Sequence, residues 1–361
     1  MIPTYIKILI LVIAATNSLV CQSSVAGEEV CQSCQACDDQ IWVVSARDLG
    51  SGDCACPPNF SLEKWEHNQW LCSNLNNYQT LCSESIPTVL FIHGYQTDLS
   101  DAKRRGMQAY QNLFANSGYS GPIRFVIWAW RSERNRGRAL RDYINKSRQA
   151  VNLGNVFAHS LNDLATDRTV VIGYSLGVQI AVSGLTQCCF YQGQPVQLAI
   201  IAAATDCDFA TKTMMPIARQ NIASTTVFVN TKDRAVRASN LICRFRRGPS
   251  YQRFNQFAIQ NSSNLGQLNF VDLLCEASRS HSIARYTRLP TVQHAIQQLV
   301  LQSADCTQEP HWPLTQPYGC PCTDGNRCNC TLVETTNLAV AFADALEEPE
   351  PLTPQKPAKD D

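Results

Sequence analysis

Ser175 lies in the pentapeptide Gly173-Tyr174-Ser175-Leu176-Gly177, between an apolar run at residues 169–172 and a helical stretch that begins at residue 178. A strand, a tight turn and a helix in this order form a nucleophile elbow, which raises a serine hydroxyl above a sheet. The two glycines are needed because a Cβ atom at either position would collide with the crossing strand or helix. The helix N-terminus behind the turn favours negative charge. The motif therefore predicts that Ser175 is a nucleophile.

A nucleophilic serine needs a base to take its proton and an acid to orient that base. Asp233 follows the strand-like run 225–230 by three residues, which is close enough to reach back over the end of the strand. Asp206 and Asp208 follow an earlier strand and are the main alternatives. Asp272 lies inside a predicted strand and is a weaker candidate. We predict that Asp233 is the acid.

Three histidines follow Asp233 in the chain, namely His281, His294 and His311. His281 lies in a polar loop after the last strand, where an imidazole can be presented to the elbow. His294 has the pattern of a solvated helix residue, and His311 lies in an appended loop. We therefore predict that His281 is the base. His93 precedes the serine, and we expect it to be a buried, hydrogen-bonded turn residue.

The strand at residues 88–92 ends in His93-Gly94-Tyr95-Gln96, where the glycine lets the backbone turn toward a reacting carbonyl. We predict that the backbone N–H groups of Tyr95 and Leu176 form an oxyanion hole, with Gln96 as the alternative to Tyr95. A serine, a base and an acid with such donors can form and hydrolyse an acyl-enzyme. This chemistry needs no metal ion or other cofactor, and we expect none.

The elements that must position these residues alternate in type between residues 83 and 304. Strands are predicted at residues 88–92, 123–130, 169–174, 197–204, 225–230 and 269–274. Helices are predicted at residues 98–116, 138–164, 178–190, 210–221 and 291–302. This alternation, together with near-continuous apolar strands, indicates an α/β fold with a mostly parallel sheet and helices on both faces.

The first residues have the pattern of a secretory signal peptide. Lys7 precedes a short apolar run, and small residues precede an expected cleavage site after Ala26, so we assign residues 1–26 to the signal. Lipidation at Cys21 is the alternative. The signal predicts export to the periplasm, the cell surface or the medium. No later stretch is long and apolar enough to predict a transmembrane helix.

The segments that flank the core are rich in cysteine or proline. We expect cysteine-rich segments at residues 27–82 and 305–345, and a disordered tail at residues 346–361. In the first of these segments, residues 40–45 and 69–75 are predicted to be strands.

The chain has 18 cysteines, a density typical of exported proteins with disulfide bonds. Removal of Cys21 with the signal leaves 17, so at least one thiol is free or pairs between chains. The spacing Cys31-x-x-Cys34-x-x-Cys37 is also compatible with a zinc or iron–sulfur site, although disulfides are preferred because the chain is expected to meet oxidants.

Lys+Arg and Asp+Glu number 30 each among the 361 residues, so the net charge is near zero. This balance argues against nucleic acid as a partner. A local basic run is compatible either with a solvated helix face or with a rim that attracts an anionic substrate; it consists of Arg131, Arg134, Arg136, Arg138, Arg141, Lys146 and Arg148. The cluster Arg244, Arg246 and Arg247 has the same two interpretations.

Residues 83–290 resemble an uncharacterised, mainly bacterial, esterase/lipase-like branch of the α/β-hydrolase superfamily, a domain of unknown function. The matching segments are Phe91-Ile-His-Gly-Tyr-Gln-Thr97, Val126-Ile-Trp-Ala-Trp-Arg-Ser132, the elbow, and Lys232-Asp-Arg-Ala-Val236 followed by Ser239. Relatives commonly have proline at position 131, and histidine and methionine beside the serine, where this chain has Arg131, Tyr174 and Leu176. The resemblance implies the α/β-hydrolase fold and supports Asp233 as the acid.

These observations predict an exported serine hydrolase that acts on a carboxylic ester, either a small molecule or a lipid, in solution or in association with the cell surface. One alternative is a peptidase or amidase with the same triad. Another is a catalytically silent hydrolase fold whose cysteine-rich ends make it an extracellular binding module.

Overall fold

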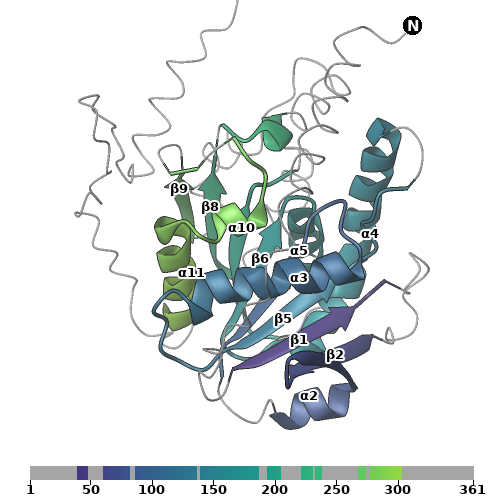
Figure 1. Cartoon of the computed structure of the whole chain (residues 1–361), viewed down its shortest axis with the longest axis vertical. Helices are drawn as coiled ribbons and strands as arrows, with labels where there is room; N and C mark the ends of the chain where they lie inside the picture. Colours follow the sequence, from purple (N-terminus) through teal and green to yellow (C-terminus); the bar gives the residue numbers. More distant parts are fainter. Residues whose placement is uncertain are drawn as a thin grey trace, which may run out of the picture.

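The computed structural model describes residues 39–47, 60–81, 86–135, 139–186, 193–204, 221–230, 232–237, 267–273, 276–277 and 279–302. These residues form one nine-stranded sheet with the strand order β3-β2-β1-β5-β4-β6-β7-β8-β9. All strand pairs from β1 to β9 in this order are parallel, whereas β2 and β3 form an antiparallel extension. Figure 1 shows the sheet and the helices packed on it.

The bounds of the elements follow the chain in order. The strands are β1 (Gln40–Ser45), β2 (Ser61–Glu66), β3 (Gln69–Ser73), β4 (Thr88–Ile92), β5 (Arg124–Ala129), β6 (Thr169–Tyr174), β7 (Val196–Ile201), β8 (Ile222–Val229) and β9 (Gln267–Asp272). The helices are α2 (Leu75–Leu81), α3 (Leu99–Tyr110), the π-helical turn η1 (Gln111–Ala115), α4 (Ala139–Leu164), α5 (Gly177–Leu185), α10 (Ile283–Tyr286) and α11 (Pro290–Gln302).

Helices cover both faces of the sheet. Successive residues of each central strand point to opposite faces, so each strand packs against helices on both sides. In β4, Val89 and Phe91 pack in an apolar cluster with residues of α3 and α11, whereas Leu90 and Ile92 pack in a second cluster with residues of α4 and α5. Figure 1 shows α3 and α11 in front of the sheet. The central strands therefore lie between two apolar layers, which explains why their sequences are apolar throughout.

Every residue of the elbow helix α5 is buried. It packs against α4 on one side and follows β6 directly on the other. The Ser183 hydroxyl in α5 donates a hydrogen bond of 2.8 Å to the backbone carbonyl of Val151 in α4. The residues that follow β6 are therefore fixed between the sheet and a second helix.

The predicted central elements agree with the structure, and the strands at residues 88–92 and 169–174 agree to the residue. The predicted helix at residues 98–116 is divided into α3 and the turn η1. The elements β2, α2 and α10 were not predicted, because their polar, partly exposed sequences lack clear apolar periodicity. Most of the predicted helix at residues 210–221 lies outside the described residues.

The sheet extends beyond the expected start of the core at residue 83. β1 pairs in parallel with β5 along its whole length, because the Ile-Trp-Val-Val sequence of β1 is apolar on both faces. Trp42 is fully buried, and its ring meets Tyr78 of α2 edge-on at 5.1 Å between ring centroids. Residues 40–45 therefore contribute to the same packed sheet as the elbow.

Among the described residues no helix combines the length and the apolar character that a membrane crossing requires. Cys72 on β3 is exposed and forms no disulfide within the described part of the chain. The other cysteines on which the disulfide and metal interpretations rest, including Cys31, Cys34 and Cys37, lie outside that part.

Candidate active site

Ser175 stands in the sharp turn between β6 and α5, with a backbone φ of 55°. A residue other than glycine rarely adopts this left-handed backbone conformation, which is the expected geometry at the serine of a nucleophile elbow. A Cβ atom on Gly173 would lie 2.9 Å from the Cα atom of Val178, and one on Gly177 only 2.3 Å from the carbonyl oxygen of Ile92. The flanking glycines are therefore required by close backbone contacts, as the motif predicted.

The side chains of Ser175, His281 and Asp233 form a continuous line of hydrogen bonds. The Ser175 Oγ atom lies 2.9 Å from Nε2 of His281, and Nδ1 of the same ring lies 2.7 Å from Oδ2 of Asp233. Because the carboxylate accepts, Nδ1 carries a proton and Nε2 is left to accept the serine hydroxyl. The structure thus brings together three side chains that are up to 106 positions apart in the chain.

Asp233 is fully buried, and both of its carboxylate oxygens accept hydrogen bonds. Oδ1 accepts the backbone N–H groups of Ala235 at 2.9 Å and Val236 at 3.1 Å. Oδ2 accepts His281 and, at 2.7 Å, the hydroxyl of Tyr286. Burial alone would raise the pKa of Asp233, but the hydrogen bond and charge of His281 and the other donors outweigh burial and lower this pKa. The carboxylate is therefore held in its charged form.

Tyr286 and Asn230 support the carboxylate and were not identified from the sequence. Asn230 donates from Nδ2 to the Tyr286 hydroxyl at 2.9 Å, so the hydroxyl proton is directed to Asp233. Burial, followed by the charge of Asp233, raises the pKa of Tyr286, which keeps it a neutral donor. Tyr286 lies 53 positions from Asp233, in the short helix α10, and nothing in the local sequence marks it.

Tyr174, next to the nucleophile, contacts the loop that carries the base. Its hydroxyl donates to the backbone carbonyl of His281 at 2.7 Å, and the two rings stack at 5.3 Å between centroids. Tyr174 links the elbow to the loop of the base.

The turn after β4 passes directly beside the nucleophile, because a Cβ atom on Gly94 would lie 2.8 Å from the Cβ atom of Ser175. The backbone N–H groups of Tyr95 and Leu176 form no hydrogen bond with another described residue. The N–H of Gln96 instead donates to the backbone carbonyl of Ser132 at 2.9 Å. The alternative donor Gln96 is therefore already used, and Tyr95 and Leu176 keep donors that an oxyanion requires.

His93 is buried and hydrogen-bonded, as expected for a structural turn residue. Its Nε2 atom accepts the backbone N–H of Trp130 at 3.2 Å, and its Nδ1 atom lies 3.0 Å from the carbonyl oxygen of Gly94. The ring stacks on Trp130, with 5.9 Å between centroids. Burial lowers the pKa of His93 from 6.5 to about 4, so the ring is neutral at physiological pH. His93 therefore supports the turn and does not contact Ser175.

The remaining candidates for acid and base are placed away from this line or are not described. His294 is exposed on α11. Asp272 is the last residue of β9, and its side chain lies outside the description. Asp206, Asp208 and His311 also lie outside the described residues.

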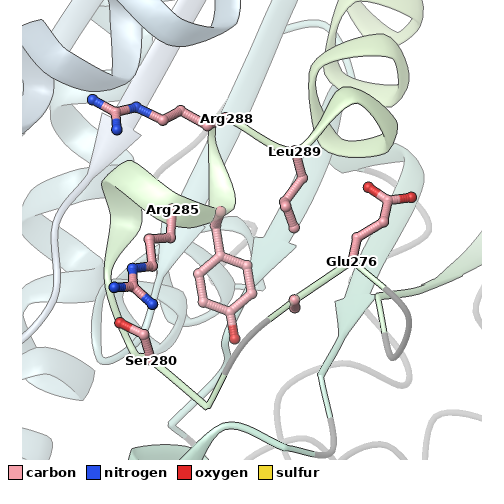
Figure 2. A pocket seen from close by; sticks show the side chains of 7 residues that line it. Glu276, Ser280, Arg285, Arg288 and Leu289 are labelled. Carbon is pink, nitrogen blue, oxygen red and sulfur yellow. The ribbon is translucent and has the colours of Figure 1, made fainter. Parts of the chain in front are cut away.

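A cavity of about 190 Å³ lies beside the loop of the base, between that loop and α10. Its lining includes Tyr286, Ala277 and Leu289, whereas Ser175 and His281 do not line it. Figure 2 shows Arg285 and Ser280 on one side of the cavity and Glu276 on the opposite side. The Tyr286 side chain therefore separates this cavity from the buried carboxylate of Asp233.

The arrangement as a whole can transfer a proton from a hydroxyl to an imidazole whose tautomer is held by an ionised carboxylate. The backbone N–H groups of Tyr95 and Leu176 can donate hydrogen bonds to a negatively charged oxygen. These are the components of nucleophilic acyl transfer.

Comparison with known proteins bears on the fold. Residues 72–300 match the sequence model of a family described as "Alpha/beta hydrolase of unknown function (DUF900)". No curated protein matches the sequence. Among solved structures, a provisionally assigned cell surface hydrolase from Lactobacillus plantarum WCFS1 is 15% identical, with a TM-score of 0.35 over 63% of this chain and 94% of that chain. The acylaminoacyl peptidase of Pyrococcus horikoshii is 10% identical, with a TM-score of 0.28 over 68% of this chain and 46% of that chain.

Proposed function

Because the chain belongs to the family of α/β-hydrolases of unknown function that matches residues 72–300, we propose that it is a serine hydrolase of carboxylic esters. The family membership confirms the predicted resemblance and the predicted α/β-hydrolase fold. The observation that supports the catalytic proposal most directly is the line of hydrogen bonds from Ser175 through His281 to Asp233.

In the proposed mechanism, Ser175 Oγ attacks the ester carbonyl while Nε2 of His281 takes its proton. Asp233 stabilises the imidazolium that forms. The N–H groups of Tyr95 and Leu176 hold the oxyanion, which collapses as His281 returns the proton to the leaving alcohol. Water, deprotonated by the same ring, then attacks the acyl-enzyme and releases the acid, so Ser175 regains its proton.

The proposal includes export of the chain and a small-molecule or lipid ester as substrate. It assigns residues 1–26 to a cleaved signal peptide, 27–82 and 305–345 to cysteine-rich segments, 83–304 to the hydrolase domain, and 346–361 to a disordered tail. The strands β1, β2 and β3 of the first cysteine-rich segment extend the sheet of the hydrolase domain. The pattern of the first residues and the density of cysteines support this division.

The test is covalent labelling of the purified protein by a fluorophosphonate probe, which reacts with activated serines. We expect labelling of the wild type and none of Ser175→Ala. The matched control is Ser100→Ala, which removes an exposed serine hydroxyl at the start of α3 and should leave labelling unchanged. A folded wild-type protein without Ser175-dependent labelling would contradict the proposal and favour a binding module.

A second assay separates esterase from peptidase. Short p-nitrophenyl esters and the corresponding peptide anilides are compared under the same conditions. We expect hydrolysis of the esters to be faster by several orders of magnitude. Faster hydrolysis of anilides would assign the same triad to a peptidase or amidase.

A further inference from the structure

Positive charge is concentrated in the stretch of chain that supplies the acid and the base. Residues 232–290 contain ten Lys and Arg residues against three Asp and Glu residues, so this stretch has a net charge of +7 in a chain whose total is zero. The ten cations are Lys232, Arg234, Arg237, Arg244, Arg246, Arg247, Arg253, Arg279, Arg285 and Arg288. The asymmetry is confined to the stretch of sequence that contains the proposed acid and base.

The described cations of this stretch lie next to the acid and the base. Arg234 directly follows Asp233, and Arg279 precedes His281 by two residues. The two arginines are neighbours in space, since the backbone N–H of Arg234 donates to the carbonyl oxygen of Arg279 at 3.4 Å. Both side chains are exposed. Two guanidinium groups therefore extend into solvent beside the carboxylate and imidazole that reach Ser175.

A third cation approaches the same loop from α10. Figure 2 shows the Arg285 side chain extending toward Ser280, the residue that precedes His281.

Cations on other elements are accompanied by acidic residues. On α3, Arg105 pairs with Asp101 at 3.7 Å, and after β5, Arg131 pairs with Glu133 at 3.3 Å. In the described part of the chain, by contrast, Arg234, Arg279 and Arg288 form no ion pair with a carboxylate.

The stretch also contains three acidic residues, namely Asp233, Asp272 and Glu276. Asp233 is fully buried and bound to His281, and Glu276 accepts the hydroxyl of Thr291. The cations outnumber these carboxylates, which leaves the stretch with an excess of positive charge.

We propose that the natural substrate is an ester that carries a negatively charged group, and that Arg234 and Arg279 attract and orient that group. This inference rests on the proposed esterase function. A concentration of unneutralised cations at a site raises the local concentration and the association rate of anions by tenfold or more at low salt. An anionic polymer or membrane would also meet a basic surface, but these cations border the acid and base of the reaction, which favours the substrate.

The test compares three phenyl acetates that differ in charge at one position. 4-Acetoxybenzoate is anionic, 4-acetoxybenzamide is its neutral analogue of the same shape, and 4-acetoxybenzyl-trimethylammonium is cationic. At about 20 mM NaCl we expect kcat/KM to decrease in that order, with about a tenfold difference between the first two esters. At about 500 mM NaCl the difference should fall at least threefold, because salt screens exposed charges.

Two variants locate the effect. The double variant Arg234→Gln/Arg279→Gln should lower the anionic-to-neutral ratio of kcat/KM at least threefold. Arg148→Gln is the matched control, because Arg148 is exposed on α4, about 14 Å along that helix from its first residue. This control should leave the ratio unchanged.

The outcomes separate the two proposals. Equal Ser175-dependent hydrolysis of all three esters would overturn the charge preference and leave the esterase proposal intact. The same result, combined with salt-dependent retention of the protein on immobilised heparin, would assign the basic stretch to binding of an anionic polymer. Absence of any Ser175-dependent hydrolysis would overturn both proposals.

Discussion

Ser175 is held in place by the backbone around it, whereas Asp233 and His281 are held by hydrogen bonds between side chains. On the nucleophile side, Gly173 and Gly177 admit the close contacts of the elbow, and the serine adopts a φ of 55°. On the acid–base side, the two residues are 48 positions apart in the chain, and the acid orients the base through a hydrogen bond between their side chains. One side therefore depends on steric fit and the other on polar contacts.

This difference determines how each side responds to substitution. A left-handed conformation costs about 1–2 kcal/mol, and here the buried helix α5 and its contacts with α4 maintain it. The nucleophile side should therefore be sensitive to small increases in volume, even at positions without chemistry. On the acid–base side, isosteric substitutions should leave the fold intact but lower the activity.

The largest effect should come from Asp233→Asn. The amide has the same size as the carboxylate, but it cannot stabilise an imidazolium and can hold the ring in the wrong tautomer. We expect kcat for ester hydrolysis to fall about 10⁴-fold. The circular dichroism spectrum should be retained. Asp101→Asn on α3 is the control and should have near-normal kcat. Turnover close to the wild type in Asp233→Asn would mean that another carboxylate is the acid.

The opposite response is expected at Gly177, which has no part in the chemistry. An alanine Cβ atom would lie 2.3 Å from the carbonyl oxygen of Ile92 and 2.7 Å from that of His93. We expect Gly177→Ala to lower the free energy of unfolding by about 3 kcal/mol or more, and to abolish fluorophosphonate labelling. Urea denaturation measures the first effect.

A control for Gly177→Ala is Gly118→Ala. Gly118 has a φ of 79° but no atom within 4 Å of an added Cβ, so this variant should lose only about 1 kcal/mol. Equal losses in the two variants would show that small shifts relieve the close contacts at Gly177, so that these contacts do not limit the elbow.

Low pH should lower the free energy of unfolding through His93, which supports the turn beside the nucleophile. The ring titrates near 6.5 in an unfolded chain and at about 4 in the folded protein, because burial lowers its pKa. Between these values the unfolded state binds more protons than the folded state, so the free energy of unfolding decreases as pH falls. The full loss from this residue is about 3 kcal/mol at pH about 4.

Urea denaturation between pH 7 and about 4 measures the loss from His93. In His93→Gln the decrease with falling pH should be smaller by that amount, whereas His294→Gln on the exposed side of α11 should behave like the wild type. The same pH dependence in His93→Gln and the wild type would place the acid sensitivity elsewhere.

The two sides also differ in how far the sequence predicts them. The elbow is a local pattern, so β6 and the turn at Ser175 could be recognised from adjacent residues. Asp233 and His281 could be predicted only from chain order and from their positions after strands. Asn230 and Tyr286 could not be predicted, because their contacts join separate segments through side chains, and a tyrosine in a short helix has no distinguishing pattern.

The smallest effect, and the sharpest test of the acid–base side, is expected from Tyr286→Phe. The change removes one of the donors to Asp233 Oδ2 and keeps the ring that packs beside it. We expect kcat to fall about fivefold to tenfold, which corresponds to about 1 kcal/mol. Since this hydroxyl helps to lower the pKa of Asp233, its loss should raise that pKa. A more basic carboxylate accepts more strongly from the His281 ring and stabilises the imidazolium, so the decline of kcat/KM on the acidic side should begin at a higher pH than in the wild type.

Tyr119→Phe is the matched control for this pH profile. Its ring packs against Phe114, away from the carboxylate of Asp233, and its loss of a hydroxyl should change neither kcat nor the acidic limb. A purely structural role of Tyr286 would lower stability without moving that limb. A wild-type rate and pH profile in Tyr286→Phe would mean that His281 and the backbone N–H groups of Ala235 and Val236 hold the carboxylate unaided. The acid would then depend on the backbone much as the nucleophile does, and the contrast between the two sides would be confined to the base.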